Sequence, residues 1–454
     1  MLFDWTLCNC RNATSPTGTK VRSTAMQMNT QAAKTPAKKL NSDFWKYWTG
    51  QTISNLGSSV TLFALPLLVY QMTGSAINLG ISGAANFLPY LLFGLVLGAW
   101  TDRIDRKRMM IFTDIARALI VATIPLLAVL GALPVWWLYI VGFIHSTLTI
   151  CFEAGEFAAI PSLVNQDDLV TANGRIQASY SAAQIIGPLL AGLLVFKVPL
   201  PTLMLIDALS FLVSSASLLL IRISFNVKEG EKKEKTSIRQ DVVEGLRYVL
   251  SHPVLRNISM MMAMVNFVSA ASYAQLVLFA KVRLEASDTQ VSLLFSAGSL
   301  GVVIMGLLAG PLRKRWSFST VALGALMLSG LLELAFSQMR WFWIAAFLWM
   351  IAGGLGILFN INTSSLRQAI VPNHMLGRVI SIASVLAWSA IPLGSLLGGF
   401  AISWTRNVAL VFAITSTLTF LIPLSFAFTA LGHADRYIPK KEVEATASAA
   451  TNIP

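Results

Sequence analysis

Apolar stretches separated by short polar segments run along nearly the whole chain. About 20 apolar residues, at ~1.5 Å rise per residue, are enough to cross the hydrocarbon core of a bilayer. Stretches of this kind fall at 48–70, 77–100, 109–130, 135–157, 176–196, 202–222, 257–280, 289–309, 318–338, 342–362, 379–403 and 408–430. The pattern predicts an all-α membrane protein with twelve transmembrane helices, and this even number of spans puts both termini on one side.

Lys and Arg residues gather in alternate connections between these stretches. Most of the 34 lie in the N-terminal tail, the even-numbered connections and the C-terminal tail. The other connections carry only Lys197, Lys281, Arg283, Arg340 and Arg406. Because basic loops stay on the cytoplasmic side, we expect both termini in the cytoplasm and the spans in the cell (inner) membrane. The same sorting accounts for the net charge of +13, so we expect the bilayer and not nucleic acid as the partner.

The composition agrees with a membrane protein that needs no cofactor. The chain is 55% hydrophobic and 12% charged, whereas soluble proteins average roughly 25% charged residues. Cys8 and Cys10 have no His or further Cys nearby, and Cys151 stands alone in the fourth span, so neither a disulfide framework nor a metal site is expected. No G-x-x-x-x-G-K-[ST] loop occurs, which argues against direct use of ATP. We expect no enzyme.

One charged loop has a specific pattern. The loop after the second span reads Gly98-x-x-x-Asp102-Arg103-x-x-Arg106-Lys107. This spacing resembles the loop 2-3 motif of the major facilitator superfamily, with one departure at Asp105, where the family usually has Gly. The resemblance implies a conformational gate, in which Asp102 contacts the start of the eleventh helix near Gly377 and holds the outward-facing state closed to the cytoplasm.

Internal repeats indicate two six-helix halves. Gly94-Leu-Val-Leu-Gly98 is echoed by Gly306-Leu-Leu-Ala-Gly310, and Gly187-Pro-Leu-Leu-Ala-Gly192 by Gly394-Ser-Leu-Leu-Gly-Gly399. Parallel repeats with a substrate path between them are what the superfamily fold contains. We expect a disordered cytoplasmic tail at 1–44, halves at 45–222 and 257–431, a cytoplasmic linker with an amphipathic helix at 223–256, and a second cytoplasmic tail at 432–454.

Two further motifs narrow the resemblance. Glu244-Gly-Leu-Arg-Tyr-Val and His252-Pro-Val-Leu-Arg256 in the linker are similar to the macrolide-efflux and enterobactin-exporter branch of the superfamily. The helix-bend motif at Gly187, Pro188 and Gly192 resembles the motif associated with the superfamily's antiporters. The resemblance therefore implies export.

Ionisable residues inside the spans are costly and call for an explanation. Asp114 and Arg117 lie three apart on one face of the third span; we favour a structural ion pair, with a proton-coupling role for Asp114 as the alternative. Glu153 and Glu156 share a face of the fourth span, and two neighbouring carboxylates favour binding of a proton by one of them. The alternative for Glu156 is an ion pair with Arg106, Arg175 or Arg378.

The remaining candidates are weaker. Asp207 and Glu333 lie toward the outer ends of their spans, where an acid either carries protons or simply reaches water. Polar side chains within the spans are candidates for lining the path or, alternatively, for joining helices: Gln51, Asn55, Ser58, Asn266, Asn360 and Asn362.

The resemblance and the intramembrane acids together predict a monomeric secondary active transporter. It exports a small amphipathic or hydrophobic solute, such as a drug or a siderophore, in exchange for protons by alternating access. The alternatives are a metabolite importer or lipid transporter of the same fold, and a receptor or assembly protein that does not transport.

The sorting of basic residues makes a topology prediction. A Ser237→Cys variant, with the three native cysteines replaced, should react with impermeant thiol reagents only from the cytoplasmic side, because the linker lies between two basic segments. Labelling in intact cells and in everted vesicles measures this. Labelling from outside intact cells would contradict the twelve-span topology.

Overall fold

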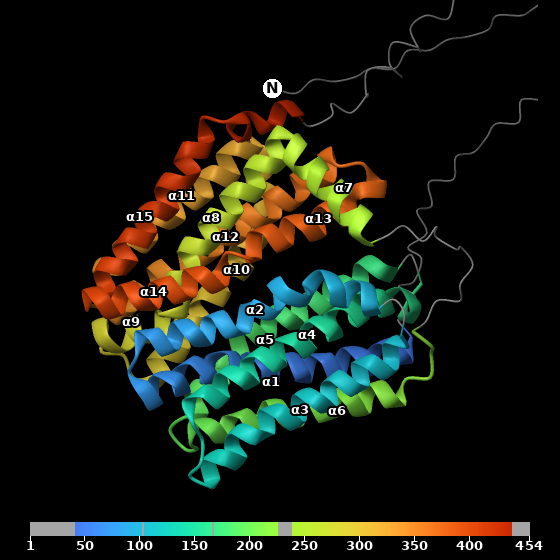
Figure 1. Ribbon diagram of the computed structural model, residues 1–454, viewed down its shortest axis with the longest axis vertical. Coiled ribbons are helices and arrows are strands. Elements are labelled where there is room, and N and C mark those ends of the chain that lie inside the picture. The colour runs from blue at the N-terminus through green and yellow to red at the C-terminus, as the bar shows by residue number, and fades with distance from the viewer. Residues whose placement is uncertain (1–40, 102–103, 166–167, 226–237, 438–454) are drawn as a thin grey trace, which may run out of the picture. The chain divides into compact units, whose positions relative to one another are not determined.

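The computed structural model describes residues 41–101, 104–165, 168–225 and 238–437. The chain divides into two units, Met1–Lys39 and Leu40–Pro454. Every described residue belongs to the second of these units. These residues form helices joined by short connections (Figure 1), and no strand occurs among them.

The first six helices correspond to the first six predicted spans. They are α1 (Ser42–Thr73), α2 (Ala76–Thr101), α3 (Arg106–Val129), α4 (Val135–Leu163), α5 (Leu169–Leu194) and α6 (Leu200–Leu220). The predicted amphipathic helix follows as α7 (Ile238–Ser251). Leu246 and Val249 of α7 pack against a buried apolar cluster that includes Val379 and Ile382.

The later helices correspond to the other six predicted spans. They are α8 (Pro253–Ala274), α9 (Leu276–Arg283), α10 (Asp288–Arg315), α11 (Phe318–Gln338), α12 (Phe342–Ile370), α13 (Asn373–Trp388), α14 (Ile391–Thr405) and α15 (Val408–Ala427), followed by the 3-10 segment η2 (Ala430–Tyr437). In the described part of the chain, eleven helical segments are long and apolar enough to cross a membrane, the one at Ile382–Thr405 running from α13 into α14. The more polar α5 completes the twelve.

Two predicted spans are broken, where the sequence pattern suggested continuous helices. The seventh span divides at Gln275 into α8 and α9, and the eleventh divides after Trp388 into α13 and α14. Pro392 stands in the first turn of α14, and a proline has no N–H for the preceding turn. The break in the eleventh span therefore has a direct cause in the sequence.

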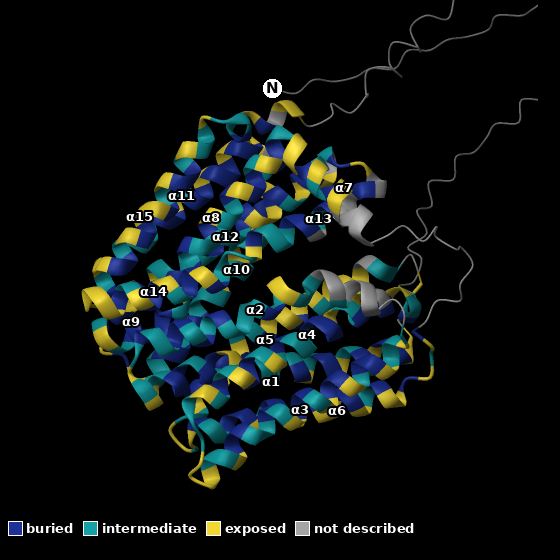
Figure 2. Cartoon of the chain, in the orientation of Figure 1, coloured by how far each residue is buried: buried dark blue, intermediate teal, exposed yellow. Residues whose placement is uncertain are grey.

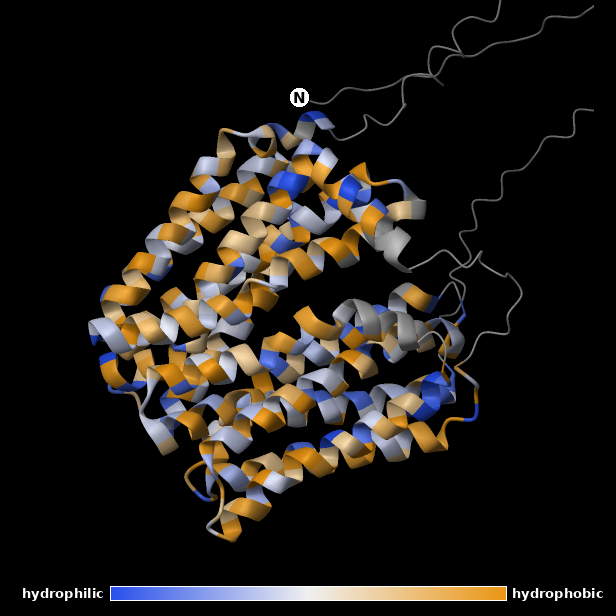
Figure 3. Ribbon diagram, viewed as in Figure 1, coloured by the Kyte–Doolittle hydropathy of each residue, from blue (hydrophilic) through white to orange (hydrophobic). Residues whose placement is uncertain are grey.

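Exposed residues and hydrophobic residues both occur along the outer faces of the helices (Figures 2 and 3). Leu193, Leu307 and Trp404 are 64%, 77% and 89% exposed. Many exposed Leu, Ile and Phe residues occur on the same helices. Such surfaces suit lipid tails, which solvate apolar groups as well as a protein core does.

The helices pack as two groups that meet along two lines of contact. Within the first group α1 packs on α5 and α6, α2 on α4, and α3 on α6; within the second, α10 and α11 pack on α12, and α11 on α15. Between the groups, α2 lies against α14 and α5 against α10. We call the end of the bundle with the connections after α2, α4 and α6 the basic end, and the opposite end the far end.

Glycines permit the closest helix crossing in the second group. A methyl group at Gly301 of α10 would lie 1.7 Å from the Met350 carbonyl oxygen of α12, and one at Gly354 would lie 2.5 Å from the Gly301 carbonyl oxygen. Without a hydrophobic force between helices in lipid, such close packing supplies the attraction. The crossing of α10 and α12 therefore requires glycine at both positions.

This crossing predicts the effect of one methyl group. Gly301→Ala should destabilise the protein by roughly 1–3 kcal/mol, because the backbones must separate. Gly306→Ala is the matched control on the same helix, since nothing lies within 4 Å of the added group. Thermal unfolding of the detergent-solubilised protein measures both variants, and equal unfolding temperatures would contradict the account.

Candidate functional site

A buried ion pair lies in the middle of the first group of helices. Arg117 donates a hydrogen bond to Asp114 in an i, i+3 salt bridge on α3, and both side chains are almost fully buried. The Ser214 hydroxyl of α6 donates to the second Asp114 oxygen at 2.6 Å, and Gln51 of α1 donates to Ser214 at 2.8 Å. The acid is therefore neutralised and held by three helices.

Aromatic rings cover the other side of the pair. The Arg117 guanidinium lies 4.5 Å from the ring centre of Phe152 and 4.4 Å from that of Phe211. A cation held over two ring faces gains electrostatic stabilisation without water. The spacing of Asp114 and Arg117 predicted the pair, but the two rings come from α4 and α6 and have no signal in the sequence.

Glu153 and Glu156, one turn apart on α4, lie in different surroundings. Glu156 accepts a hydrogen bond from the Tyr47 hydroxyl of α1. Glu153 is exposed, and among the described residues it has neither a hydrogen bond nor an ion pair. Its electrostatic neighbours include Glu156, Arg117 and the phenols of Tyr90 and Tyr180.

Two of the arginine partners expected for Glu156 have other contacts. The contact found for Glu156 is Tyr47, while Arg175 lies with its guanidinium 4.7 Å from the ring centre of Trp45. Arg106 donates to the Phe225 carbonyl oxygen at 3.3 Å. The side chain of Arg378 lies outside the described residues. The expectation of an ion pair overlooked Tyr47 because it lies 109 residues away in the sequence.

Asp207 does not reach water as an acid at the end of a span would. Its side chain has no exposed surface, and the Ser58 hydroxyl of α1 donates to its Oδ1 at 3.1 Å. Thr61 of α1 also lies next to the carboxylate, although no hydrogen bond of good geometry reaches Oδ2 among the described residues. The position of Asp207 along its span did not predict its burial, because α1 covers this end of α6.

At the basic end of the first group, charged side chains contact the backbone at the start of α3 and just after α6. Lys107 donates to the Ile221 oxygen at 2.6 Å, and Asp105 caps α3 by accepting from the Arg108 N–H at 2.8 Å. Asp43 accepts from the Arg222 and Ile223 N–H groups. The contact of Asp43 was not expected from the sequence, and the gate role of Lys107 stays a prediction.

Part of the predicted gate motif lies outside the described residues. Asp102 and Arg103 are not described, nor are the surroundings of Gly98 and Gly377. Lys107 contacts Ile221, the C-cap residue of α6, and Arg106 contacts Phe225 in the segment after α6, so both contacts lie within the first group of helices. The gate contact of Asp102 therefore stays a prediction.

In the described chain, the hydrogen bonds between the two groups lie toward the far end. Thr289 of α10 donates to the Gly192 oxygen at 2.9 Å, Gln275 donates to the Ala76 oxygen at 2.8 Å, and Gln71 donates to Asp288 at 3.0 Å. A methyl group at Gly192 would lie 1.8 Å from the Ser292 hydroxyl, so this glycine allows α5 to touch α10. Gly187 plays the same part between α5 and α1, where Ser59 lies 2.4 Å from the position of a methyl group.

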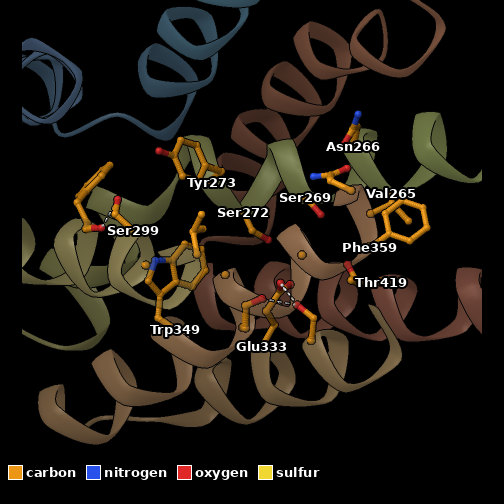
Figure 4. A pocket seen from close by; sticks show the side chains of 18 of the residues that line it. Val265, Asn266, Ser269, Ser272, Tyr273, Ser299, Glu333, Trp349, Phe359 and Thr419 are labelled. Carbon is orange, nitrogen blue, oxygen red and sulfur yellow. Dashed lines mark hydrogen bonds between the residues drawn. The ribbon is translucent and has the colours of Figure 1, made fainter. Parts of the chain in front are cut away.

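A cavity of about 320 Å³ lies on the inner side of the second group. Its walls come from α8, α10, α11, α12 and α15, with Leu62 and Phe63 of α1 and Gln184 and Pro188 of α5. Figure 4 shows Tyr273, Trp349, Phe359 and Glu333 around it. The lining is mainly apolar with a few polar groups, as in sites for small organic molecules.

The predicted lining residues divide between this cavity and the helix contacts. Asn266 and Asn360 line the cavity. Asn362 donates to the Leu358 oxygen of its own helix at 2.7 Å, and Gln51 and Ser58 hold Asp114 and Asp207 through the bonds above. Asn55 is half-buried and lies outside the cavity lining. Side-chain type alone could not separate these roles.

Glu333 has surroundings that the sequence pattern did not suggest. It lines the cavity, and the Ser329 hydroxyl lies 3.1 Å from its Oε1. The sequence pattern missed this because α12 and α15, which pack on α11, bring the cavity to that level of the helix.

Twelve spans in two packed groups, with a cavity on their inner side, define a membrane transporter of the major facilitator type. The chain belongs to the transmembrane secretion effector family, whose family model matches residues 35–450.

Curated relatives and solved structures agree with this class. The chain is 27% identical to macrolide efflux protein A of Streptococcus pyogenes over 361 residues, covering 78% of this chain and 88% of the relative. It is 26% identical to the multidrug efflux pump Tap of Mycolicibacterium fortuitum, covering 76% and 85%. The fold resembles an inward-facing bacterial homologue of the human lysosomal transporter Spinster, with a TM-score of 0.68, 14% identity and coverage of 88% and 98%.

The buried ion pair predicts how two substitutions combine. Asp114→Asn should cost roughly 3–5 kcal/mol and lower the yield of folded protein, because Arg117 is left as a buried uncompensated charge. The double variant Asp114→Leu with Arg117→Met should recover much of that yield. Size-exclusion profiles and thermal unfolding measure both. A single variant that folds normally but does not transport would instead assign Asp114 a coupling role.

Proposed function

We propose that this protein is a secondary active exporter that exchanges a small amphipathic or hydrophobic solute for protons by alternating access. The observation that carries the proposal is the contrast between two sites in the first group. Asp114 is neutralised by Arg117, whereas Glu153 has no ion-pair partner among the described residues. A carboxylate kept in a membrane span without a structural partner is a candidate for binding and releasing a proton.

The contacts of Tyr90 connect Glu153 to the interface between the halves. Tyr90 of α2, an electrostatic neighbour of Glu153, packs edge-on against Trp388 of α13 at 5.4 Å between ring centres. Protonation of Glu153 would change the charge next to a contact that joins the halves. Such a change can bias two conformations of a transporter.

We assign the basic end to the cytoplasm, with both termini on that side of the cell membrane, and treat 45–222 and 257–431 as the moving halves joined by 223–256. In this orientation the hydrogen bonds between the halves lie toward the outer side, as an inward-facing state requires. Asp102 would then form its gate contact near Gly377 only after the halves rock to the outward-facing state.

The names of the relatives support export of organic compounds. Macrolide efflux protein A and the multidrug efflux pump Tap are both named for outward transport. We propose the same direction here, with the protein acting as a monomer. A macrolide and a set of lipophilic dyes are the first compounds to test.

Glu153→Gln tests the proton site. This variant resembles a permanently protonated carboxyl, so it should abolish accumulation driven by a pH gradient while leaving downhill exchange of the compound largely intact. Everted membrane vesicles at matched protein levels measure both activities.

Glu156→Gln is the matched control on the same helix. Since Glu156 contacts Tyr47, its loss should mainly reduce the amount of folded protein. Full gradient-driven accumulation by Glu153→Gln would place coupling elsewhere, with Asp114 and Asp207 as the next candidates. Absence of gradient-driven accumulation of any compound by the wild type would refute the proposed function.

A further inference from the structure

Glu333 is a second membrane-embedded acid, and it belongs to the other half of the molecule. It is the only residue of α11 with a charged side chain. Among the described residues it has no salt bridge, since the salt bridges found there join Lys46 with Asp43, Arg117 with Asp114, and Lys281 with Asp288.

The surroundings of Glu333 supply no cation. Helix α15 has no ionisable residue, and α10 has charged residues only at its ends. Arg367 of α12 donates to the Met262 sulfur at 3.1 Å and is not part of the cavity lining. Tyr273 is the other ionisable side chain of the described lining, and it is a phenol.

The hydrogen bonds of Glu333 suit two states of the carboxyl group. The Ser329 hydroxyl lies 3.1 Å from Glu333 Oε1 and 3.1 Å from the Ala352 carbonyl oxygen. One hydroxyl proton serves one acceptor well, so an ionised Glu333 accepts from Ser329, while a protonated Glu333 donates to Ser329 and lets it donate to Ala352. Neither state leaves the carboxyl without a partner on this side (Figure 4).

The rest of the cavity wall combines aromatic and aliphatic side chains with uncharged polar ones. Trp349, Phe295, Phe359 and Tyr273 supply the aromatic rings, and Asn, Gln, Ser and Thr side chains supply the polar groups. Trp349 stands beside Gly298, where a methyl group would lie 2.9 Å from the indole nitrogen, so the glycine leaves room for the ring. A cation gains from aromatic ring faces as well as from a carboxylate, and a neutral ligand body gains from burial.

We propose that this cavity binds lipophilic organic monocations, with the positive group at Glu333 and the apolar body against Trp349 and Phe359. The inference rests on the proposed function, because it names the substrate class of that exporter. A proton and the organic cation compete for one carboxylate, so each lowers the occupancy of the other. The Glu333 carboxylate is then neutralised in both states, by a proton in one and by the organic cation in the other.

Binding of radiolabelled tetraphenylphosphonium to the purified full-length protein in detergent tests this site. Wild-type protein should bind it more tightly at pH 8 than at pH 5.5, because a proton competes at the lower pH. It should not bind tetraphenylborate, which has a similar size and the opposite charge. Glu333→Gln should weaken tetraphenylphosphonium binding at least ~10-fold and remove the pH dependence, since an ionised partner is lost.

Two controls separate charge from folding. Glu333→Asp keeps the charge and should retain pH-dependent binding. Glu285→Gln makes the same chemical change at an exposed acid outside the cavity lining and should bind as the wild type does. The comparison of the two probes on wild-type protein needs no variant and tests the site even if Glu333→Gln does not fold.

The outcomes distinguish this inference from the proposed function. No binding of tetraphenylphosphonium to the wild type, equal binding of tetraphenylborate, or unchanged binding by folded Glu333→Gln would each overturn the inference. The assay needs neither a gradient nor turnover. Absence of proton-driven transport together with Glu333-dependent binding would therefore refute the proposed function and leave the cation site standing.

Discussion

The hydrocarbon core of a membrane holds no water to solvate a charge, and this constraint decides what each ionisable side chain in the spans can do. The charge of Asp114 is balanced by Arg117, and Ser214 donates a hydrogen bond to it. Two aromatic rings lie against the Arg117 guanidinium. Glu153 and Glu333 lack an ion-pair partner among the described residues. Glu156 and Asp207 also lack a salt bridge there, but hydroxyl groups donate to them. Glu153 is exposed and Glu333 lines the cavity, so we propose these two acids for exchange and a structural role for Asp114.

The same constraint shapes the contact between the halves. Thr289 and Gln275 donate to backbone carbonyl oxygens across the interface, and Gly192 allows the helices to touch. No salt bridge joins the two groups of helices within the described ranges. Each such hydrogen bond contributes only about 1 kcal/mol net. An interface of this kind suits halves that separate in each transport cycle.

Hydropathy and charge predicted the helices well because each span must satisfy its own backbone. The i, i+3 spacing likewise predicted the pairing of Asp114 with Arg117, a local feature of one helix. The contact of Tyr47 with Glu156 and the cavity position of Glu333 depend on which helices become neighbours. Position along a single span carries no such information, so both were missed.

The central claim is that solute and proton move in opposite directions through one protein. Proteoliposomes containing the purified protein and a trapped pH indicator test it directly, without any variant. A concentration gradient of a transported compound is imposed across the vesicle membrane, with any net charge movement balanced by a permeant ion. Protons should then move against the direction of compound flow. An excess of a competing compound should stop both movements. Flow of the compound with no accompanying change of internal pH would contradict the account.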